Sequence, residues 1–263
     1  MSDASILLEM RDGVARITLN RPDRLNSFND AMHAQLREAL DRVKADASVR
    51  VLVLTGAGRG FCAGQDLSDR AVAPGGAAVD LGASIERNYL PLILALRSLP
   101  MPVVCAVNGV AAGAGANIAL ACDLVIAAKS ASFIQAFCRI GLIPDSGGTY
   151  WLPRLVGTAR AIGLAMLGDK LPADQAEAWG LIWKCVDDAQ LAATVDALAA
   201  QLAQAPTKGL AAIKQALYAA DHNSLLQQLE LERDLQRSLG YSDDYREGVA
   251  AFVGKRPPRF TGR

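Results

Sequence analysis

The 263-residue sequence predicts an α/β fold whose last third is helical. Three nearly continuous apolar runs, at 51–55, 103–107 and 124–128, have the β-branched composition and the length of strands covered on both faces. From Thr158 onward, alanine-rich helical stretches broken by Gly and Pro replace them. Because no Gly/Ser/Pro linker divides the chain, we expect one main layered α/β domain.

The first elements predicted are a hairpin and a helix. Residues 6–10 and 14–19 flank Arg11-Asp-Gly13, and an Asp-Gly pair between short apolar runs is a strong hairpin signal. Ser27 is the expected N-cap of the following helix. The apolar residues of that helix repeat at helical spacing, at Met32, Leu36, Leu40 and Val43.

The three buried strands are separated by segments of different character. These are a Gly-rich loop at 56–64, a segment that becomes helical at about 85–96, and a small-residue helix starting near Gly113. The helical stretches of the last third are expected at 159–167, 173–179, 191–202, 208–219 and 225–239. The order β-α-β-β-α favours a layered α/β domain over a helix bundle.

Charge and cysteine content narrow the function classes. Lys+Arg and Asp+Glu number 27 each, so the chain lacks the basic excess that a nucleic-acid or anionic-membrane partner favours. The five cysteines are widely spaced and odd in number, which indicates reduced thiols and gives no support for a metal site. Without a signal-peptide pattern or an apolar run of transmembrane length, we expect a cytoplasmic protein with no membrane partner.

The two histidines argue against a histidine-activated nucleophile. His33 and His222 both fall on predicted amphipathic helices away from the apolar middle of the chain. A Ser-His or Cys-His pair needs a histidine near the active loops. We expect both histidines to lie on the surface.

Asp145 is the only carboxylate between Asp123 and Asp169. It lies in Gly141-Leu-Ile-Pro-Asp-Ser-Gly-Gly-Thr149, a loop otherwise made of turn formers and apolar residues. A carboxylate in an apolar setting tends to have a raised pKa, which suits a proton-transferring base. The alternative is that Asp145 only caps a helix beginning near Gly147.

Two loops could hold a developing negative oxygen. Phe61-Cys-Ala-Gly-Gln-Asp-Leu67 and Asn108-Gly-Val-Ala-Ala-Gly-Ala-Gly-Ala-Asn117 each follow a strand and leave room for close backbone approach. The second also opens a helix, whose first N–H groups and positive dipole end favour an anion. The alternative is that its small residues only allow close helix packing. Neither loop has the spacing of a phosphate loop or a dinucleotide fingerprint.

Motifs spread over nearly the whole chain resemble those of the enoyl-CoA hydratase/isomerase (crotonase) family. They are Phe61-Cys-Ala-Gly-Gln-Asp-Leu67, Ala106-Val-Asn-Gly109 with the Gly-Ala-Gly run after it, Cys122-Asp-Leu124, Gly141-Leu-Ile-Pro144, Gly147-Gly-Thr149 and Glu247-Gly-Val-Ala-Ala-Phe-Val-Gly-Lys-Arg256. The resemblance implies a crotonase-like spiral of ββα units over residues 1–200 and a helical trimerisation region over 201–263. It also implies an acyl-CoA substrate, no cofactor, and a homotrimer or a dimer of trimers.

The same resemblance assigns roles to residues. It implies that the backbone N–H groups of Ala63 and Ala114 form an oxyanion hole and that Asp145 is the catalytic acid. Arg24 and Leu25 would meet the adenosine diphosphate part of CoA. The other substrate- or CoA-binding positions are Gly64, Gln65, Asp66, Leu67, Gly113, Asn117, Phe137, Pro144, Phe252 and Lys255. A solvated surface for the arginines and trimer packing for Phe252 remain alternatives.

One departure from the family pattern decides the expected reaction. Hydratases of the family have two water-activating glutamates, and the matching positions here are Asn117 and Phe137. Neither side chain can exchange a proton, so we expect proton transfer by Asp145 beside the thioester rather than hydration. Asn117 would orient the substrate or only pack.

The resemblance is strongest to isomerases, and it implies conversion of ring-1,2-epoxyphenylacetyl-CoA to oxepin-CoA. A general Δ3,Δ2-enoyl-CoA isomerase and a non-catalytic CoA-binding scaffold are alternatives. A hydrolytic dehalogenase would need a core histidine, and there is none from residue 34 to 221. The acyl group and the choice of trimer or hexamer stay open, and we expect residues 72–84 to form a mobile wall of the acyl pocket.

Overall fold

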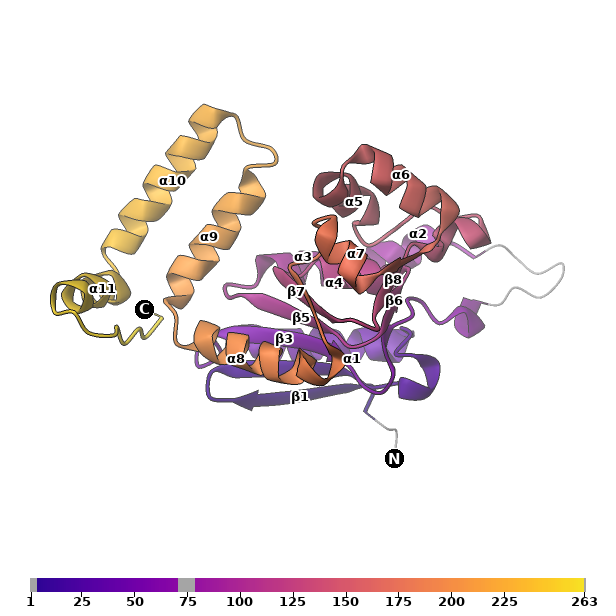
Figure 1. The fold of residues 1–263 in the computed structure, drawn as a ribbon, viewed down its shortest axis with the longest axis horizontal. Coiled ribbons are helices and arrows are strands. Elements are labelled where there is room, and N and C mark those ends of the chain that lie inside the picture. Colours follow the sequence, from indigo (N-terminus) through magenta and orange to yellow (C-terminus); the bar gives the residue numbers. More distant parts are fainter. Residues whose placement is uncertain (1–3, 71–78, 263) are drawn as a thin grey trace.

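The computed structural model describes residues 4–70 and 79–262, and their strands form two sheets (Figure 1). The larger sheet has the order β1-β2-β3-β5-β7-β10 and the smaller one the order β4-β6-β8-β9. The larger sheet comprises β1 (Ile6–Arg11), β2 (Val14–Leu19), β3 (Val51–Gly56), β5 (Val103–Val107), β7 (Leu124–Ala128) and β10 (Lys184–Val186). The smaller sheet comprises β4 (Gly60–Cys62), β6 (Val110–Ala112), β8 (Ser132–Ile134) and β9 (Lys170–Pro172).

The order of these strands along the chain describes a spiral. In each turn one strand joins the larger sheet, the next joins the smaller sheet, and a helix follows. The three clearest turns are β3-β4-α3, β5-β6-α4 and β7-β8-α5, with α3 at Leu90–Ser98, α4 at Ala114–Leu120 and α5 at Gly148–Val156. Neighbouring turns pair in parallel, as β3 does with β5 and β4 with β6. The predicted spiral of ββα units is confirmed.

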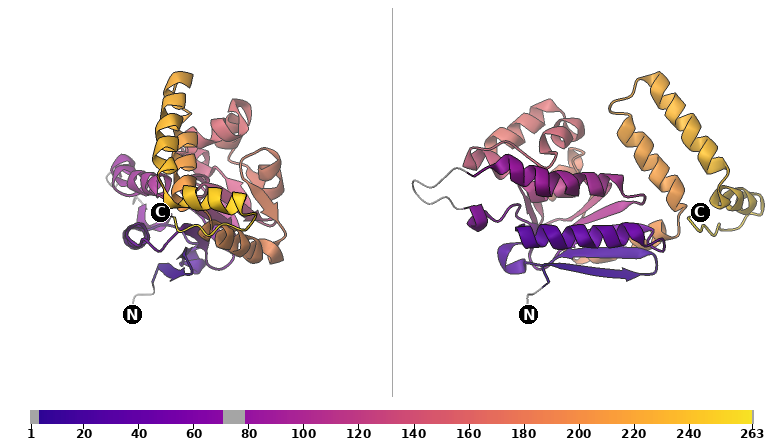
Figure 2. Two further views of the ribbon diagram at one scale, coloured as in Figure 1. Left: turned by 90° about the vertical axis from the view of Figure 1, so that its left-hand side faces the viewer. Right: turned by 180° about the vertical axis from the view of Figure 1, so that it is seen from behind.

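Helices cover the larger sheet on both faces, which explains its apolar strands. α8 (Leu191–Ala203) lies across the face seen in Figure 1, and α1 (Asp30–Ala45) and α3 lie on the opposite face (Figure 2, right). Every residue of β5 is buried, so the run at 103–107 carries no polar side chain. The remaining helices of the body are α2 (Leu81–Ser84), α6 (Thr158–Leu167) and α7 (Ala173–Ala178).

The predicted N-terminal elements hold with one error. Asp12 and Gly13 have φ of 53° and 79°, as the hairpin turn requires. The N-cap of α1 is Asn29, whose side chain accepts a hydrogen bond from Met32 N at 2.9 Å. Ser27 was wrongly expected as the cap. It lies buried before the helix, and its carbonyl oxygen accepts a hydrogen bond from Arg21 Nη1.

His33 is buried, which corrects the expectation that it lies on the surface. Only 4% of it is exposed, and its ring centroid lies 4.6 Å from those of both Phe28 and Tyr89. Its position three residues before Leu36 places it on the apolar face of α1. His222 is exposed, as expected, and its Nε2 lies 3.1 Å from the Tyr150 hydroxyl.

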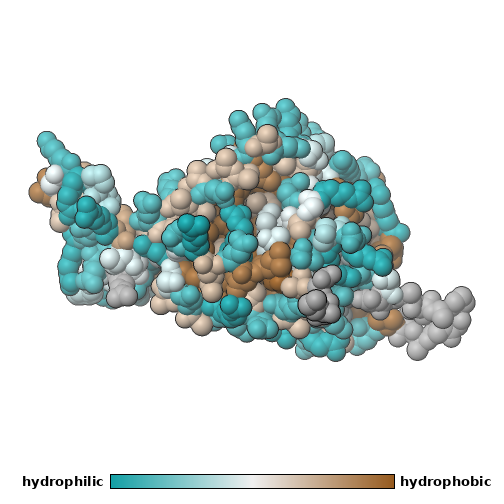
Figure 3. Space-filling model, turned by 90° about the horizontal axis from the view of Figure 1, so that it is seen from below, coloured by the Kyte–Doolittle hydropathy of each residue, from teal (hydrophilic) through white to brown (hydrophobic). Residues whose placement is uncertain are grey.

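The last three helices stand away from the body as an arm, which we define as α9 (Thr207–Ala219), α10 (Leu225–Gly240) and α11 (Asp243–Val253) (Figures 1 and 2). Seen from below, the arm forms a separate lobe at one end of the molecule (Figure 3). Arg50, just before β3, donates hydrogen bonds to Thr207 Oγ1 at the start of the arm, to Ala205 O before it and to Phe260 O after it. The arm exposes large apolar side chains, among them Ile213, Leu217, Leu229, Phe252 and Val253.

The helical stretches predicted between Thr158 and Gly240 are confirmed as α6 to α10, while α11 and the short strands were not foreseen. The division at residue 200 stays a prediction. Most of the expected mobile wall at 72–84 lies outside the described residues, which resume at Val79. No helix in the described part of the chain is long and apolar enough to span a bilayer. Residues 4–70 and 79–262 also contain no group of three or more His, Cys, Asp or Glu suited to a metal ion.

Candidate active site

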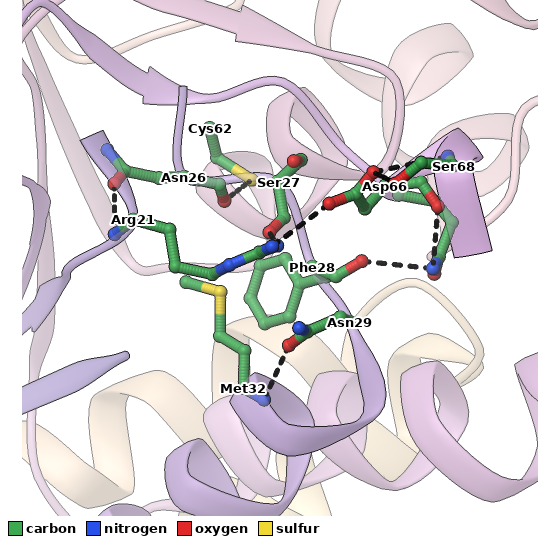
Figure 4. A network of polar contacts seen from close by, with 10 residues as sticks. Arg21, Asn26, Ser27, Phe28, Asn29, Met32, Cys62, Asp66 and Ser68 are labelled. Carbon is green, nitrogen blue, oxygen red and sulfur yellow. Dashed lines mark hydrogen bonds and ion pairs between the residues drawn. The ribbon is translucent and has the colours of Figure 1, made fainter. Parts of the chain in front are cut away.

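A web of hydrogen bonds joins the 21–28 segment to the loop after β4 (Figure 4). Asn26 is fully buried with a left-handed φ of 56°, a conformation that asparagine tolerates better than most residues. Its Nδ2 donates to the carbonyl oxygens of Gly60 at 2.9 Å and Phe61 at 3.1 Å. Its own carbonyl oxygen accepts the thiol of Cys62 at 3.2 Å. Asn26 therefore fixes β4, the strand that leads into the loop of the candidate site.

Asp66 anchors the far end of the same loop. Its Oδ2 lies 3.0 Å from Arg21 Nη2, and its Oδ1 accepts the Ser68 hydroxyl at 2.6 Å (Figure 4). The hydrogen bonds from Ser68 and the guanidinium of Arg21 lower the pKa of the Asp66 carboxyl against the opposing effect of burial. Asp66 is thus an ionised structural anchor, held by partners within the protein.

Ala63 does not present its N–H to the site, which corrects its expected role as an oxyanion donor. That N–H donates to the Leu25 carbonyl oxygen at 2.9 Å. Another N–H of the same loop is better placed, as the bonds to Phe28 show. Phe28 N donates to Gly64 O at 2.7 Å, and Asp66 N donates to Phe28 O at 2.8 Å. In such a parallel bridge the N–H of the residue between them, Gln65, points away from the partner segment. On this loop, Gln65 and not Ala63 aims its N–H outward.

The second candidate donor, Ala114, lies close to this loop. Ala114 opens α4, so its N–H belongs to the first helical turn and has no acceptor inside the helix. A Cβ at Gly64 would lie 3.3 Å from Ala114 N and 2.9 Å from Ala112 O. Gly113 precedes the helix with a φ of 54°, which favours glycine. These two glycines bring the two loops together.

Cys62 packs at the contact between the two loops. Its thiol is fully buried, and burial raises its pKa to about 12 despite the hydrogen bond from Gly64 N. Cys105 and Cys122 are also buried, whereas Cys138 and Cys185 are half-buried. Burial raises the pKa of Cys105 well above its ordinary value.

We therefore predict that Cys62 is protected from alkylation in the folded protein. With a pKa near 12, only about 10⁻⁴ of the thiol is ionised at pH 8, and the thiolate is the reacting form. Peptide mapping after iodoacetamide treatment should find label on Cys138 and Cys185 in native protein, and on all five cysteines in urea. Rapid native labelling of Cys62 would contradict the packed contact.

Asp145 lies in the turn before α5 and is half-buried. Its Oδ1 accepts the Ser146 hydroxyl at 2.9 Å, and its carbonyl oxygen accepts Gly148 N at 2.8 Å. The N-cap of α5 is Gly147, so Asp145 lies two residues before that cap. The alternative in which the Asp145 side chain only caps the helix stays open beside the role of a base.

Asn117 binds the backbone of Asp145. It is fully buried, its Nδ2 donates to the Asp145 carbonyl oxygen at 2.8 Å, and its Oδ1 accepts Gln135 Nε2 at 2.8 Å. Phe137 is 7% exposed and would lie 3.7 Å from a Cβ at Gly113. The sequence positions 113, 117, 137 and 145 thus come together around the start of α4, and Pro144 is buried beside them.

The remaining expected positions lie on the surface. Arg24 is exposed, and Leu25 is half-buried with a left-handed φ of 48°. Leu67 is 54% exposed at the end of the β4 loop. On the arm, Phe252 is 85% exposed and Lys255 is exposed, so neither packs against the body of its own chain.

Sequence reasoning missed several residues that build the site. Gln135 and Asn26 act through buried hydrogen bonds, and Arg21 through a partly buried one, to residues far away in sequence. Tyr89 is 1% exposed and donates its hydroxyl to Gln65 Oε1 at 2.8 Å. The available signal was a polar residue beside an apolar run, which is too common to be decisive on its own.

Comparison with known proteins gives consistent matches along the chain. Residues 9–263 match the family described as enoyl-CoA hydratase/isomerase. The chain is 61% identical over 258 residues to 1,2-epoxyphenylacetyl-CoA isomerase of Escherichia coli strain K12, covering 98% of each. It is 51% identical over 263 residues to a Rhodobacter capsulatus protein named "Probable enoyl-CoA hydratase", covering 100% of each. A crystal structure of enoyl-CoA hydratase from Bacillus anthracis matches with a TM-score of 0.90 and 31% identity, covering 98% of this chain and 100% of that one.

Proposed function

The chain belongs to the enoyl-CoA hydratase/isomerase family, and on that premise we propose that it is an acyl-CoA isomerase with Asp145 as its base. The observation that carries the proposal is the different surroundings of the two carboxylates of the candidate site, Asp66 and Asp145. Asp66 is held as an ion by Arg21 and Ser68, whereas Asp145 lies in the loop packed against the start of α4. Asp145 is therefore the carboxylate suited to exchange a proton.

In the proposed mechanism, the Asp145 carboxylate removes a proton from the carbon next to the thioester carbonyl. Negative charge then develops on the thioester oxygen, and the Ala114 N–H at the helix start donates to it. The outward direction of the Gln65 N–H makes it the second donor in place of Ala63. The enolate rearranges, and Asp145 returns the proton. One donor of this kind contributes about 3–4 kcal/mol to transition-state stabilisation.

The substrate we propose is ring-1,2-epoxyphenylacetyl-CoA, which rearranges to oxepin-CoA. The support is the 61% identity, over 98% of both chains, with a protein named for that epoxide. A Δ3,Δ2-enoyl-CoA isomerase remains the second candidate, because the same base and oxyanion donors would shift a double bond. No cofactor takes part in either reaction as proposed.

Hydration is disfavoured by the residues around Asp145. Phe137 and Asn117 occupy the positions of the water-activating glutamates, and both Nδ2 and Oδ1 of the Asn117 amide are engaged with protein partners. The buried Phe137 ring against Gly113 would also exclude water. A non-catalytic scaffold is disfavoured because such a subunit would have no use for the hydrogen bonds that hold Asp145.

We further propose that the arm forms a homotrimer and supplies residues to a neighbouring site. The exposed apolar side chains of α9 to α11 would be covered in such an assembly. Phe252 and Lys255 would then approach the CoA of a neighbour, while Arg24 and Leu25 would meet the adenosine diphosphate of their own chain's CoA. The substitution Phe252→Ala should weaken CoA-thioester binding without changing the fold of the body.

The deciding experiment offers purified protein three thioesters separately: ring-epoxidised phenylacetyl-CoA, a Δ3-enoyl-CoA and crotonyl-CoA. We expect oxepin-CoA from the first, identified by mass and absorbance, and a Δ2 product from the second at a lower rate. Rapid water addition to crotonyl-CoA would overturn the isomerase proposal. Turnover of only the Δ3 thioester would favour the second candidate.

A further inference from the structure

Two buried amides connect the protein interior to Asp145. Gln135, between β8 and the turn Ala136–Ile140, is 3% exposed and donates Nε2 to Asn117 Oδ1 at 2.8 Å. Asn117, fully buried, donates Nδ2 to the Asp145 carbonyl oxygen at 2.8 Å. The hydrogen bonds run in one direction, from Gln135 through Asn117 to the backbone of the acid.

The direction of these hydrogen bonds has an energetic cost at Gln135, where they begin. Gln135 Oε1 is buried and has no hydrogen-bond partner among residues 4–70 and 79–262. Turning the Gln135 amide round would bring Oε1 against Asn117 Oδ1, and two acceptors cannot bond to each other. The unsatisfied oxygen is therefore the consequence of presenting Nε2 to Asn117. Buried polar atoms without partners are rare, so this one requires a reason.

The reason is the orientation of the Asn117 amide. A terminal amide has two nearly isosteric orientations, and only the neighbouring hydrogen bonds select between them. With Gln135 donating to Oδ1, Nδ2 must face Asp145 O. If the amide turned, its oxygen would face the Asp145 carbonyl oxygen, and the hydrogen bond between Asn117 and Asp145 would be lost.

Packing also leaves Asn117 little freedom to move. A Cβ at Gly148 would lie 2.4 Å from Asn117 Nδ2 and 2.9 Å from Pro144 Cβ, so the amide touches the backbone of the loop. The Asp145 carbonyl oxygen that it binds also accepts Gly148 N. Two donors from different segments thus fix the peptide that carries the carboxylate.

We propose that Gln135 is a positioning residue that acts through Asn117 to place the Asp145 carboxylate for proton transfer. This inference rests on the proposed function, because it assumes that Asp145 is the base. It assigns Asn117 to positioning rather than to substrate contact. A displaced base loses turnover while substrate binding persists, so the effect belongs to kcat and not to KM.

The sharpest test is Gln135→Glu followed over pH. A protonated glutamic acid can donate to Asn117 Oδ1, whereas an ionised one can only accept and would turn the Asn117 amide. Burial raises the pKa of a carboxyl at this position above its usual value, which brings the change into the measurable range. We expect the kcat of the variant, divided by that of the unmodified protein at each pH, to fall at least about 10-fold as pH rises through that pKa. KM should stay constant.

Gln35→Glu is the matched control. Gln35 Oε1 accepts hydrogen bonds from Ser5 N and Ile6 N at the start of β1, and an ionised glutamate accepts them equally well. Its kcat ratio should not vary with pH. A flat ratio for Gln135→Glu as well would overturn the proposal, since loss of stability alone would not track the ionisation of one side chain.

A second readout does not depend on activity. Gln135→Met removes the donor and keeps the shape, and NMR of the Asn117 side-chain amide should show faster hydrogen exchange than in the unmodified protein. Unchanged exchange would contradict the positioning role even if the substrate assignment failed. The two proposals can also fail separately. If Asp145→Asn retains activity, the proposed function is wrong. If the Asn117 amide still responds to Gln135→Met, the hydrogen bonds from Gln135 through Asn117 to Asp145 are nevertheless confirmed. If the methionine variant does not fold, the pH profile of Gln135→Glu decides.

Discussion

Asp145→Asn should lower kcat for the isomerisation by about 10³-fold, because a positioned general base contributes about 10² to 10⁴ to the rate. The asparagine side chain keeps an oxygen that can accept the Ser146 hydroxyl, and the backbone bonds to Gly148 and Asn117 do not involve the side chain. The loop should therefore keep its shape while it loses the base. KM should stay within about twofold, as expected when only a transition-state interaction is removed.

The measurement pairs turnover with binding. Product formation from the epoxide thioester reports the base, and calorimetry with an unreactive acyl-CoA reports the oxyanion donors and the CoA contacts. Asp169→Asn is the matched control, since Asp169 is an exposed carboxylate just before β9 and the next carboxylate along the chain. Full turnover by the Asp145 variant would exclude the proposed base.

Two kinds of strand could be predicted: the hairpin strands β1 and β2, from the Asp-Gly turn between them, and strands whose whole environment is apolar. β5 and β7 were predicted at their observed boundaries because each is covered on both faces, and every residue in them is therefore apolar. β4, β6 and β8 have three residues each and are held by pairing with distant segments, such as Ala111 with Phe133. A three-residue run contains too little periodicity to be recognised.

The errors in the site have a similar origin. An isolated acid such as Asp145 is visible because its surroundings in sequence are apolar. By contrast, which N–H on the 63–66 loop points outward depends on pairing with Phe28, about 35 residues away, so the resemblance alone put the donor at Ala63. The role of the buried Gln135 amide could not be predicted from the sequence, because it depends on the hydrogen bond to Asn117.

The N-cap of α1 was predicted two residues too early. Ser27 and Asn29 are both good N-caps by residue type. The choice between them is made by Arg21, which binds the Ser27 carbonyl oxygen, and by the hydrogen bonds that hold Phe28 against the β4 loop. These tertiary contacts hold Asn26 in the left-handed region and keep Ser27 and Phe28 out of the helix, which begins only after Asn29.

The second large effect is expected from Gly115→Ala, at the contact between the two loops. A Cβ at this position would lie 2.3 Å from the Cys62 carbonyl oxygen and 2.8 Å from Cys62 Cβ. Because both neighbours belong to a packed backbone segment, the start of α4 must move away from the β4 loop. That motion separates Ala114 N–H from the outward N–H of Gln65, which together define the proposed oxyanion hole. We expect kcat/KM to fall by about 10²-fold or more.

Gly163→Ala distinguishes this effect from a general intolerance of alanine in these helices. Gly163 lies inside α6, and nothing lies within 4 Å of the Cβ it would gain. There alanine should raise the free energy of unfolding by up to about 1 kcal/mol, since glycine is the poorer helix former. At Gly115 the same methyl should lower it by about 1–3 kcal/mol, as overpacking does. Urea unfolding and steady-state kinetics on both variants test the sign, and wild-type kcat/KM in Gly115→Ala would show that the spacing of the two loops does not set the rate.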